Sequence, residues 1–171
     1  LPIFIGNSDF YNGAFPAEYS NALSGVFDMH LRNGNNQKYE HAFQVGLMGI
    51  DLASEGPINK KRGSSYLINY RFSTTSLASG NDINLKYQDV AFKLNFPTRK
   101  AGTFSIWGLG LTDRNKVDAL ERSEWETMGD RSSGSNKLDK LAGGLAHKYI
   151  IDENTYIRSS LSATYSKTVQ W

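Results

Sequence analysis

The chain has three histidines, His30, His41 and His147, and no cysteine. Imidazole and carboxylate groups can bind a metal or transfer a proton, so their spacing shows whether such chemistry is possible. Asp28 and His30 are two residues apart, which places both on one face of a strand. No further histidine or carboxylate stands at a metal-ligand spacing from them. We therefore expect a hydrogen-bonded structural contact there, with no metal and no cofactor.

A second group of candidate acids lies between Thr112 and Asn136, a segment dense in charge with Trp125 near its middle. Two carboxylates can act together in glycoside hydrolysis, but only when a rigid element holds them at a fixed separation. The pattern of this segment predicts a solvated loop that balances its own charge, so no catalytic residue is expected. Trp125 is the candidate contact for an external ligand. The sequence thus predicts binding and no enzymatic activity.

The composition narrows the class of protein. The 171 residues carry 19 basic and 17 acidic side chains, and the formal net charge of +2 is too small to indicate nucleic-acid binding. Without cysteine, the chain has no disulfide scaffold and no thiolate zinc site. No segment approaches the roughly 20 apolar residues of a membrane-spanning helix. Membrane-spanning strands remain possible, because alternation conceals their apolar residues.

Turn-forming residues divide most of the chain into segments of roughly 8–13 residues, a spacing typical of antiparallel β-structure. Several segments alternate between apolar and polar residues, as half-buried strands do. The sequence Gly46–Gly49 predicts a tight hairpin that divides Lys38–Glu55 into two strands. Together these patterns predict an all-β antiparallel meander of about seven strands after Lys38. The other five predicted strands are Ser65–Thr74, Gln88–Phe96, Thr103–Leu111, Leu141–Tyr149 and Thr155–Lys167.

The two faces of these strands differ in chemistry. One face is small and polar, with isolated basic residues at Arg71, Lys93 and Arg158. The other is apolar, with aromatic residues near the strand ends: Tyr66, Phe72, Phe96, Phe104, Trp107, Tyr149 and Tyr165. Apolar strand faces with aromatic ends are typical of a transmembrane β-barrel, whose outer band meets lipid. The strands of a soluble β-sandwich also alternate between apolar and polar residues, so the alternation by itself fits both classes.

The predicted connections also alternate in length. Those at Gly56–Gly63, Pro97–Gly102 and Asp152–Asn154 are short, whereas Thr75–Tyr87 is intermediate and Thr112–Asn136 is long. Short turns at one end of the sheet and longer loops at the other are typical of outer-membrane barrels, where the short turns face the periplasm. The first hairpin departs from this rule, because it is short and falls at the long-loop end.

Residues 1–37 form a turn-rich segment that ends in a predicted strand. The run FYNGAFPAEY at 10–19, followed by NALSGVFD at 21–28, resembles the end of the plug domain of TonB-dependent outer-membrane receptors. It is most similar to the Bacteroidetes-type receptors, the SusC-like or carboxypeptidase-regulatory-like group. DLASEGP at 51–57, SYLINYRFS at 65–73 and FPTRKAGTFS at 96–105 are similar to the sequence that follows the plug in that family.

The resemblance implies two parts: 1–37 as the C-terminal end of a plug domain with its linker, and 38–171 as the first strands of a transmembrane β-barrel. Plugged outer-membrane transporters have about 22 strands, so we expect seven strands to be a segment of a longer protein. The resemblance implies that the parent lies in the outer membrane of a Gram-negative cell. There it would bind a siderophore, cobalamin or glycan at extracellular loops and import it with energy delivered by TonB.

The resemblance also implies partners and contacts. Outer-membrane lipid, a surface lipoprotein, the cargo and TonB are the expected partners, with TonB acting through parts of the parent outside these residues. The candidate contacts between plug and barrel are Glu18, Asp28, His30, Arg71, Lys93 and Arg158. The three basic residues are expected to point into the lumen and pair with plug carboxylates such as Glu18 or Asp28, because a charge away from water needs a partner.

Two other functions fit the same pattern of strands. One is a soluble β-sandwich that acts as an adhesin or carbohydrate-binding module, with Trp107 and Trp125 as stacking platforms. The other is a small complete outer-membrane barrel. Behaviour on extraction separates the first from a membrane protein, because a soluble sandwich needs no detergent.

Overall fold

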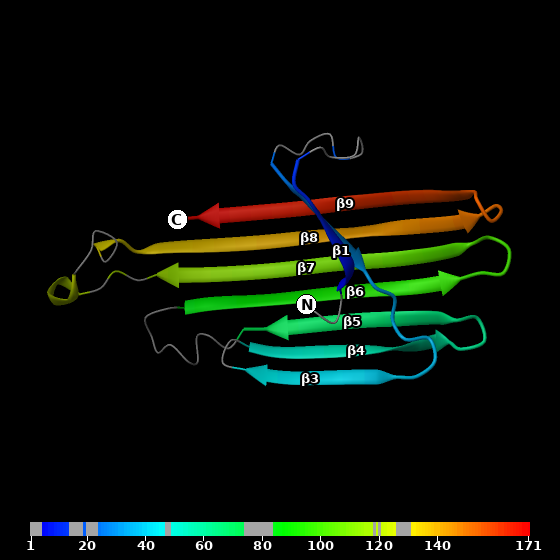
Figure 1. The fold of residues 1–171 in the computed structure, drawn as a ribbon. Helices are drawn as coiled ribbons and strands as arrows, with labels where there is room; N and C mark the ends of the chain where they lie inside the picture. Colours follow the sequence, from blue (N-terminus) through cyan, green and yellow to red (C-terminus); the bar gives the residue numbers. More distant parts are fainter. Residues whose placement is uncertain are drawn as a thin grey trace.

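The computed structural model describes residues 5–13, 19, 24–46, 49–73, 84–117, 119, 121–125 and 131–171, and it shows an all-β, antiparallel protein. Strands β1 (Ile5–Tyr11) and β2 (Val26–Leu31) pair as a two-stranded sheet. A second sheet contains seven strands in chain order, each paired with its neighbours in the sequence (Figure 1). They are β3 (Glu40–Gly46), β4 (Gly49–Asn59), β5 (Ser64–Phe72), β6 (Asn84–Pro97), β7 (Thr103–Val117), β8 (Gly134–Ile150) and β9 (Tyr156–Gln170).

The predicted meander is confirmed. The first hairpin closes where Gly46 pairs with Gly49, and the remaining strands follow the predicted alternation. Cross-strand register keeps apolar residues opposite one another, for example Ile68 opposite Phe92 and Leu145 opposite Leu161. Because a shift of one residue would move every side chain to the other face, this agreement fixes the register.

Three strands are longer than their sequence patterns indicate. β6 begins at Asn84, β7 continues to Val117 and β8 begins at Gly134, so part of the expected 112–136 loop is sheet. The added residues are largely polar and lack an apolar alternation, but polar pairs hold them together. The Thr112 hydroxyl donates to Asp139 Oδ1 across β7 and β8 at 2.8 Å. The strands therefore continue well beyond their apolar part.

The connections differ between the two ends of the seven-stranded sheet (Figure 1). At one end, the short-turn end, β4–β5, β6–β7 and β8–β9 are joined through residues 60–63, 98–102 and 151–155. At the other, the long-loop end, residues 73–83 join β5 to β6 and residues 118–133 join β7 to β8. A short 3-10 helix, η2 (Arg122–Glu124), lies in the second of these loops. The predicted alternation of loop lengths is thus present.

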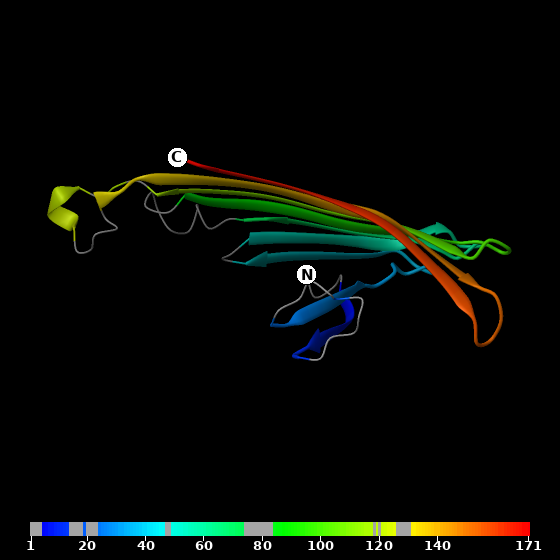
Figure 2. The same cartoon turned by 90° about the horizontal axis from the view of Figure 1, so that it is seen from above.

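The seven-stranded sheet is curved, and β1 and β2 lie on its inner side (Figure 2). Among the described residues, the buried aliphatic side chains besides Pro57 are Ala53, Leu67 and Ala91, and Leu31 from β2 packs against the last two. A single curved layer of strands buries little apolar surface by itself, so most of the apolar surface of the sheet is exposed. Among the described residues, no helix has the length and apolar character needed to cross a membrane.

Aromatic rings lie over glycines on neighbouring strands. The Phe92 ring occupies the space that a Cβ on Gly108 would need, and the Trp107 indole does the same at Gly144. Such pairs cover the exposed backbone that glycine leaves in a strand. Trp107 pairs with Lys93 and so lies on the polar face, which corrects its predicted place among the apolar aromatics. The prediction was wrong because Gly108 and Gly110 leave the alternation in β7 without apolar markers.

Candidate functional site: the two faces of the sheet

The first candidate surface is the apolar face, defined by the outward side of β3–β9. Fourteen large apolar residues on this face are exposed, and every strand contributes at least one. They are Phe43, Val45, Leu52, Ile68, Tyr70, Val90, Phe104, Ile106, Leu141, Leu145, Tyr149, Ile157, Leu161 and Tyr165. An apolar surface this wide is unusual for a monomeric soluble protein and marks a site of contact with another apolar phase or layer.

Aromatic groups mark the short-turn end of the apolar face. Phe96, Phe104 and His147 lie opposite one another on β6, β7 and β8. The Phe104 and His147 rings stack at 4.3 Å between centroids, and Tyr149 continues the row. His147 Nε2 also lies 2.6 Å from the Ala101 carbonyl in the adjacent turn, so its polar atom has a partner. The row combines two apolar phenylalanine rings with His147 and Tyr149, whose rings also carry polar atoms. Such side chains suit a boundary between an apolar and an aqueous phase.

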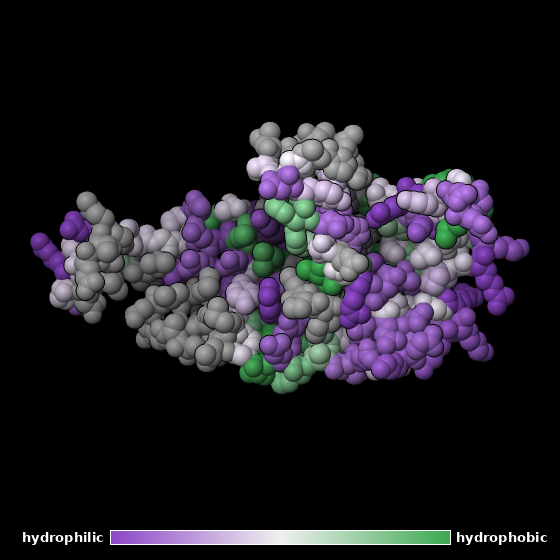
Figure 3. All heavy atoms as spheres, in the orientation of Figure 1, coloured by the Kyte–Doolittle hydropathy of each residue, from purple (hydrophilic) through white to green (hydrophobic). Residues whose placement is uncertain are grey.

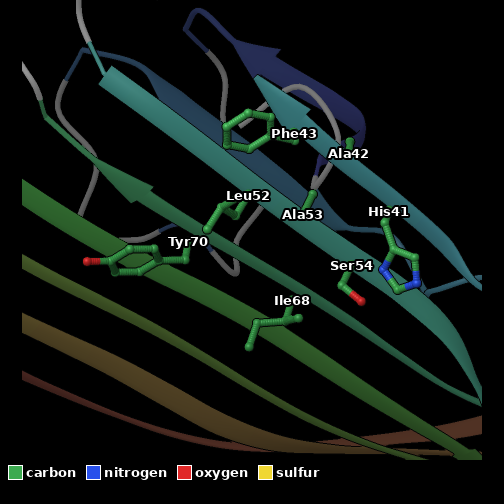
Figure 4. A pocket seen from close by; sticks show the side chains of 8 residues that line it. All are labelled: His41, Ala42, Phe43, Leu52, Ala53, Ser54, Ile68 and Tyr70. Atoms are coloured by element: carbon green, nitrogen blue, oxygen red, sulfur yellow. The ribbon is translucent and has the colours of Figure 1, made fainter. Parts of the chain in front are cut away.

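An open depression lies in the apolar face over β3, β4 and β5 (Figure 4). The side chains around it are mostly apolar, with His41 and Ser54 together at one end. The residues that line it are His41, Ala42, Phe43, Leu52, Ala53, Ser54, Ile68 and Tyr70. Such a surface accepts apolar chains but offers few directional hydrogen bonds, so it indicates no specific polar ligand.

The second candidate surface is the opposite, polar face, to which the N-terminal residues are bound. Directly after β2, Arg32 reaches Glu55 on β4 with two hydrogen bonds, Nη1 to Oε2 at 2.8 Å and Nη2 to Oε1 at 2.5 Å. The backbone N–H of Asn35 donates to the same Oε2 at 2.7 Å. Glu55 is only 7% exposed, so three donors neutralise a buried carboxylate. Hydrogen bonding to this carboxylate raises the pKa of the Arg32 guanidinium.

The contact continues through apolar packing and a lysine. Leu31 packs against Leu67, which is fully buried, and against Ala91 on the next strand. Lys93 Nζ donates to the Leu31 carbonyl at 2.5 Å. We call Leu31, Arg32, Asn35, Glu55, Leu67 and Lys93 the N-terminal contact. It joins the end of β2 and its linker to three neighbouring strands of the sheet.

Gly34 allows the linker to lie close to the sheet. A Cβ on this residue would collide with the backbone carbonyl of Tyr66 on β5. We expect Gly34→Ala to lift the linker, to break the adjacent bond from Asn35 to Glu55, and to cost about 1–3 kcal/mol, as overpacking typically does. Hydrogen exchange at the Asn35 amide measures the effect. Gly134→Ala is the control, because nothing lies within 4 Å of a Cβ there, and unchanged Asn35 exchange in Gly34→Ala would contradict the close approach.

The remaining polar-face groups pair within the sheet. Arg71 binds Asp89, directly opposite on β6, with Nε to Oδ2 at 2.8 Å and Nη2 to Oδ2 at 2.7 Å. Its guanidinium also lies over the Tyr87 ring at 5.3 Å. The predicted pairing of Arg71 with a carboxylate of residues 1–37 such as Glu18 stays a prediction, because Glu18 lies outside the described residues. The ion pair that the described residues show is with Asp89. The reason is local, because cross-strand register fixes the two side chains side by side.

The other predicted site residues are distributed as follows. Asp28 accepts a hydrogen bond from the Tyr19 hydroxyl at 2.8 Å, and His30 Nε2 lies 3.8 Å from Asp28 Oδ2, so the predicted pair is close. Glu18 lies outside the described residues. Arg158 is exposed and opposite Lys148 on β8. Trp125 lies in the loop after β7 with the Arg131 guanidinium over its ring at 5.0 Å.

Among the six candidate contacts, Lys93 touches the N-terminal segment in the structure. Sequence reasoning missed Arg32 and Glu55, whose ion pair also belongs to the N-terminal contact. The available signal was Glu55 itself, an acidic residue at a polar-face position of β4, because a carboxylate away from water requires a cation nearby. Among the described residues, no group of three His, Asp or Glu side chains could hold a metal ion. No protein-family model, curated protein or solved structure matches the chain.

Proposed function

We propose that this chain is a membrane-embedded segment of an outer-membrane β-barrel transporter. Its apolar face would meet lipid hydrocarbon, and its polar face would line the interior. The observation that carries the proposal is the apolar face, which is exposed and continuous across all seven strands. In a transmembrane barrel the outward residues are apolar and the inward residues are polar, which is the division seen between the two faces.

Strand length and sheet edges support this proposal. A tilted transmembrane strand needs about 9–11 residues to cross the hydrocarbon core. β6–β9 contain 14, 15, 17 and 15 residues, which leaves polar residues to extend past the bilayer at the long-loop end. β3 and β9 are the two edges of the sheet, and no other described strand pairs with either of them. Strand edges in lipid must be paired, so further strands from the parent protein would close the barrel.

The N-terminal contact supports the assignment of 1–37 to the end of a plug. In a plugged barrel the plug lies in the lumen, against the inward face of the strands. The end of β2 and the following linker bind that same polar face, through Arg32, Glu55 and Lys93. Combined with the resemblance of residues 10–28 to receptor plugs, this supports a TonB-dependent transporter of a siderophore, cobalamin or glycan.

The mechanism proposed for the parent involves no covalent step. Cargo binding at the extracellular loops and work delivered through TonB would shift the plug between two positions, and each input can act only by favouring one position over the other. The N-terminal contact would then set how firmly the last part of the plug is held to the barrel wall. Trp125, a described residue in the connection between β7 and β8, is proposed to meet cargo or a surface lipoprotein.

Vesicle flotation of the refolded chain tests the proposal. We expect the chain to float with phosphatidylcholine vesicles after refolding in their presence, and to resist extraction by alkaline carbonate. A soluble β-sandwich would fold without detergent and stay at the bottom of the gradient when vesicles are present, and that result would contradict the proposal. The coding sequence on either side of these residues then tests the finer assignment, since a TonB-dependent receptor requires a TonB-contacting segment before residue 1 and further strands after residue 171.

A further inference from the structure

The short-turn end of the sheet carries a cluster of basic residues that the N-terminal contact does not use. Lys60, Lys61 and Arg62 lie in the β4–β5 turn, and Arg99 and Lys100 lie in the β6–β7 turn. All five are exposed. Figure 3 shows hydrophilic residues concentrated at this end of the molecule. We call these five residues the basic turn surface.

The two turns are adjacent and well ordered by hydrogen bonds. β5 and β6 are paired strands, so the turns before β5 and after β6 meet at the same end of the sheet. Gly63 has a φ of 72°, and Pro97 Cγ lies 3.5 Å from the position of a Cβ on that glycine. Within the second turn, the Thr98 hydroxyl donates to the Gly102 carbonyl at 2.7 Å. The five cations are therefore held together by defined turns.

Few negative charges oppose this cluster. No ion pair involving these five residues occurs within the part of the chain that the structure describes. The nearest acidic turn, between β8 and β9, holds Asp152 and Glu153. Asp152 Oδ1 already accepts the Asn154 backbone N–H at 2.9 Å. The cluster thus presents a net positive charge to its surroundings.

The basic turn surface adjoins the aromatic end of the apolar face. Phe96 and Phe104 flank the β6–β7 turn, one residue before Pro97 and two residues after Gly102. A partner that matches both surfaces has an apolar part with negative charges at its boundary. Long basic side chains can reach such a boundary while their stems stay on apolar surface.

We propose that the basic turn surface binds the headgroups of anionic phospholipids in the leaflet that contacts the short-turn end. This inference rests on the proposed membrane location of the sheet. Each Lys or Arg near an anionic membrane surface contributes about 1 kcal/mol, or roughly a fivefold change in binding, before screening by salt. Removal of five such charges should therefore weaken the preference for anionic vesicles by at least about tenfold.

The experiment compares flotation with two kinds of vesicle, phosphatidylcholine alone and phosphatidylcholine mixed with phosphatidylglycerol. The test variant carries five Lys/Arg→Gln substitutions at Lys60, Lys61, Arg62, Arg99 and Lys100. The control variant carries five at the long-loop end, at Lys86, Arg114, Lys116, Lys140 and Lys167. The test and control variants each lose five positive charges. Circular dichroism in phosphatidylcholine vesicles checks that each variant keeps its β-structure.

We expect the unchanged chain and the control to prefer anionic vesicles, and the test variant to lose this preference while still binding neutral ones. Equal loss in both variants, or no preference in the unchanged chain, would overturn the inference and leave the membrane location standing. Failure to bind neutral vesicles would contradict the membrane location itself. Inorganic phosphate at matched ionic strength should not abolish the preference, and full displacement by phosphate would assign the surface to free anions instead.

Discussion

Replacing Arg32 by methionine is expected to release the linker after β2 from the sheet. Without the guanidinium, the Glu55 carboxylate keeps one donor, the Asn35 N–H, in a site where it is 7% exposed. Breaking a buried ion pair on one side typically costs about 3–5 kcal/mol, because the remaining charge has no partner. Because Arg32 is partly exposed, we expect a cost at the lower end of this range, about 3 kcal/mol. Hydrogen exchange measures it as a loss of roughly a hundredfold in protection at the Asn35 amide.

Two variants show whether this loss comes from the buried pair. Lys38→Met removes a cation from the same linker, but its partner Glu40 lies in a largely exposed pair at 2.8 Å. Exposed pairs contribute little, so Asn35 protection should stay unchanged. The double variant Arg32→Met with Glu55→Leu removes both charges, and it should recover part of the lost free energy of unfolding because no carboxylate is left unpaired. Urea unfolding measures this recovery, since Glu55→Leu also removes the acceptor of the Asn35 N–H. Equal protection in Arg32→Met and Lys38→Met would contradict the N-terminal contact.

Leu145→Arg is expected to destabilise the sheet in lipid by about 2–4 kcal/mol, the cost of a basic residue near the midplane on the lipid side of a barrel. Leu145 is 52% exposed on the apolar face and lies between Ile106 and Leu161 on the flanking strands. Urea unfolding of the chain in phosphatidylcholine vesicles measures the free energy. The effect should depend on lipid, because an arginine at an exposed position is tolerated in water.

The adjacent residue provides the matched control. Ala146 lies on the polar face, between Ser105 and Ser160. Ala146→Arg places the same charge one residue further along β8 and on the other side of the sheet, and it should cost less than about 1 kcal/mol. A similar cost for both arginines would mean that the two faces meet the same environment, which would contradict a lipid-facing apolar side.

The local alternation of apolar and polar residues was sufficient to predict most of the seven-stranded sheet. β5 and β9 follow period-two patterns, and the Gly46–Gly49 sequence correctly placed the first hairpin. The sheet continues beyond Leu111 on β7 because polar pairs such as Thr112 with Asp139 extend it without any apolar signal. Pattern analysis therefore found the apolar parts of the strands and missed their polar extensions.

The contacts between distant segments were harder to predict. Arg32 and Glu55 are 23 residues apart, one in the linker after β2 and the other on β4, so no spacing rule connects them. β1 was not predicted, since its seven residues lack a clear alternation and depend on pairing with β2. Arg71 was correctly identified as a polar-face cation in need of a partner. Its partner Asp89 could have been found by aligning the two strands on their apolar residues.

Lipid exposure along a single strand tests the central claim most directly. Because the chain has no cysteine, single-cysteine variants at positions 141 to 146 of β8 can each carry one fluorophore. In vesicles that contain brominated lipid, we predict strong quenching at 141, 143 and 145 and weak quenching at 142, 144 and 146. That alternation would place the apolar face in hydrocarbon. Uniform weak quenching, or strong quenching at the even positions, would contradict the account.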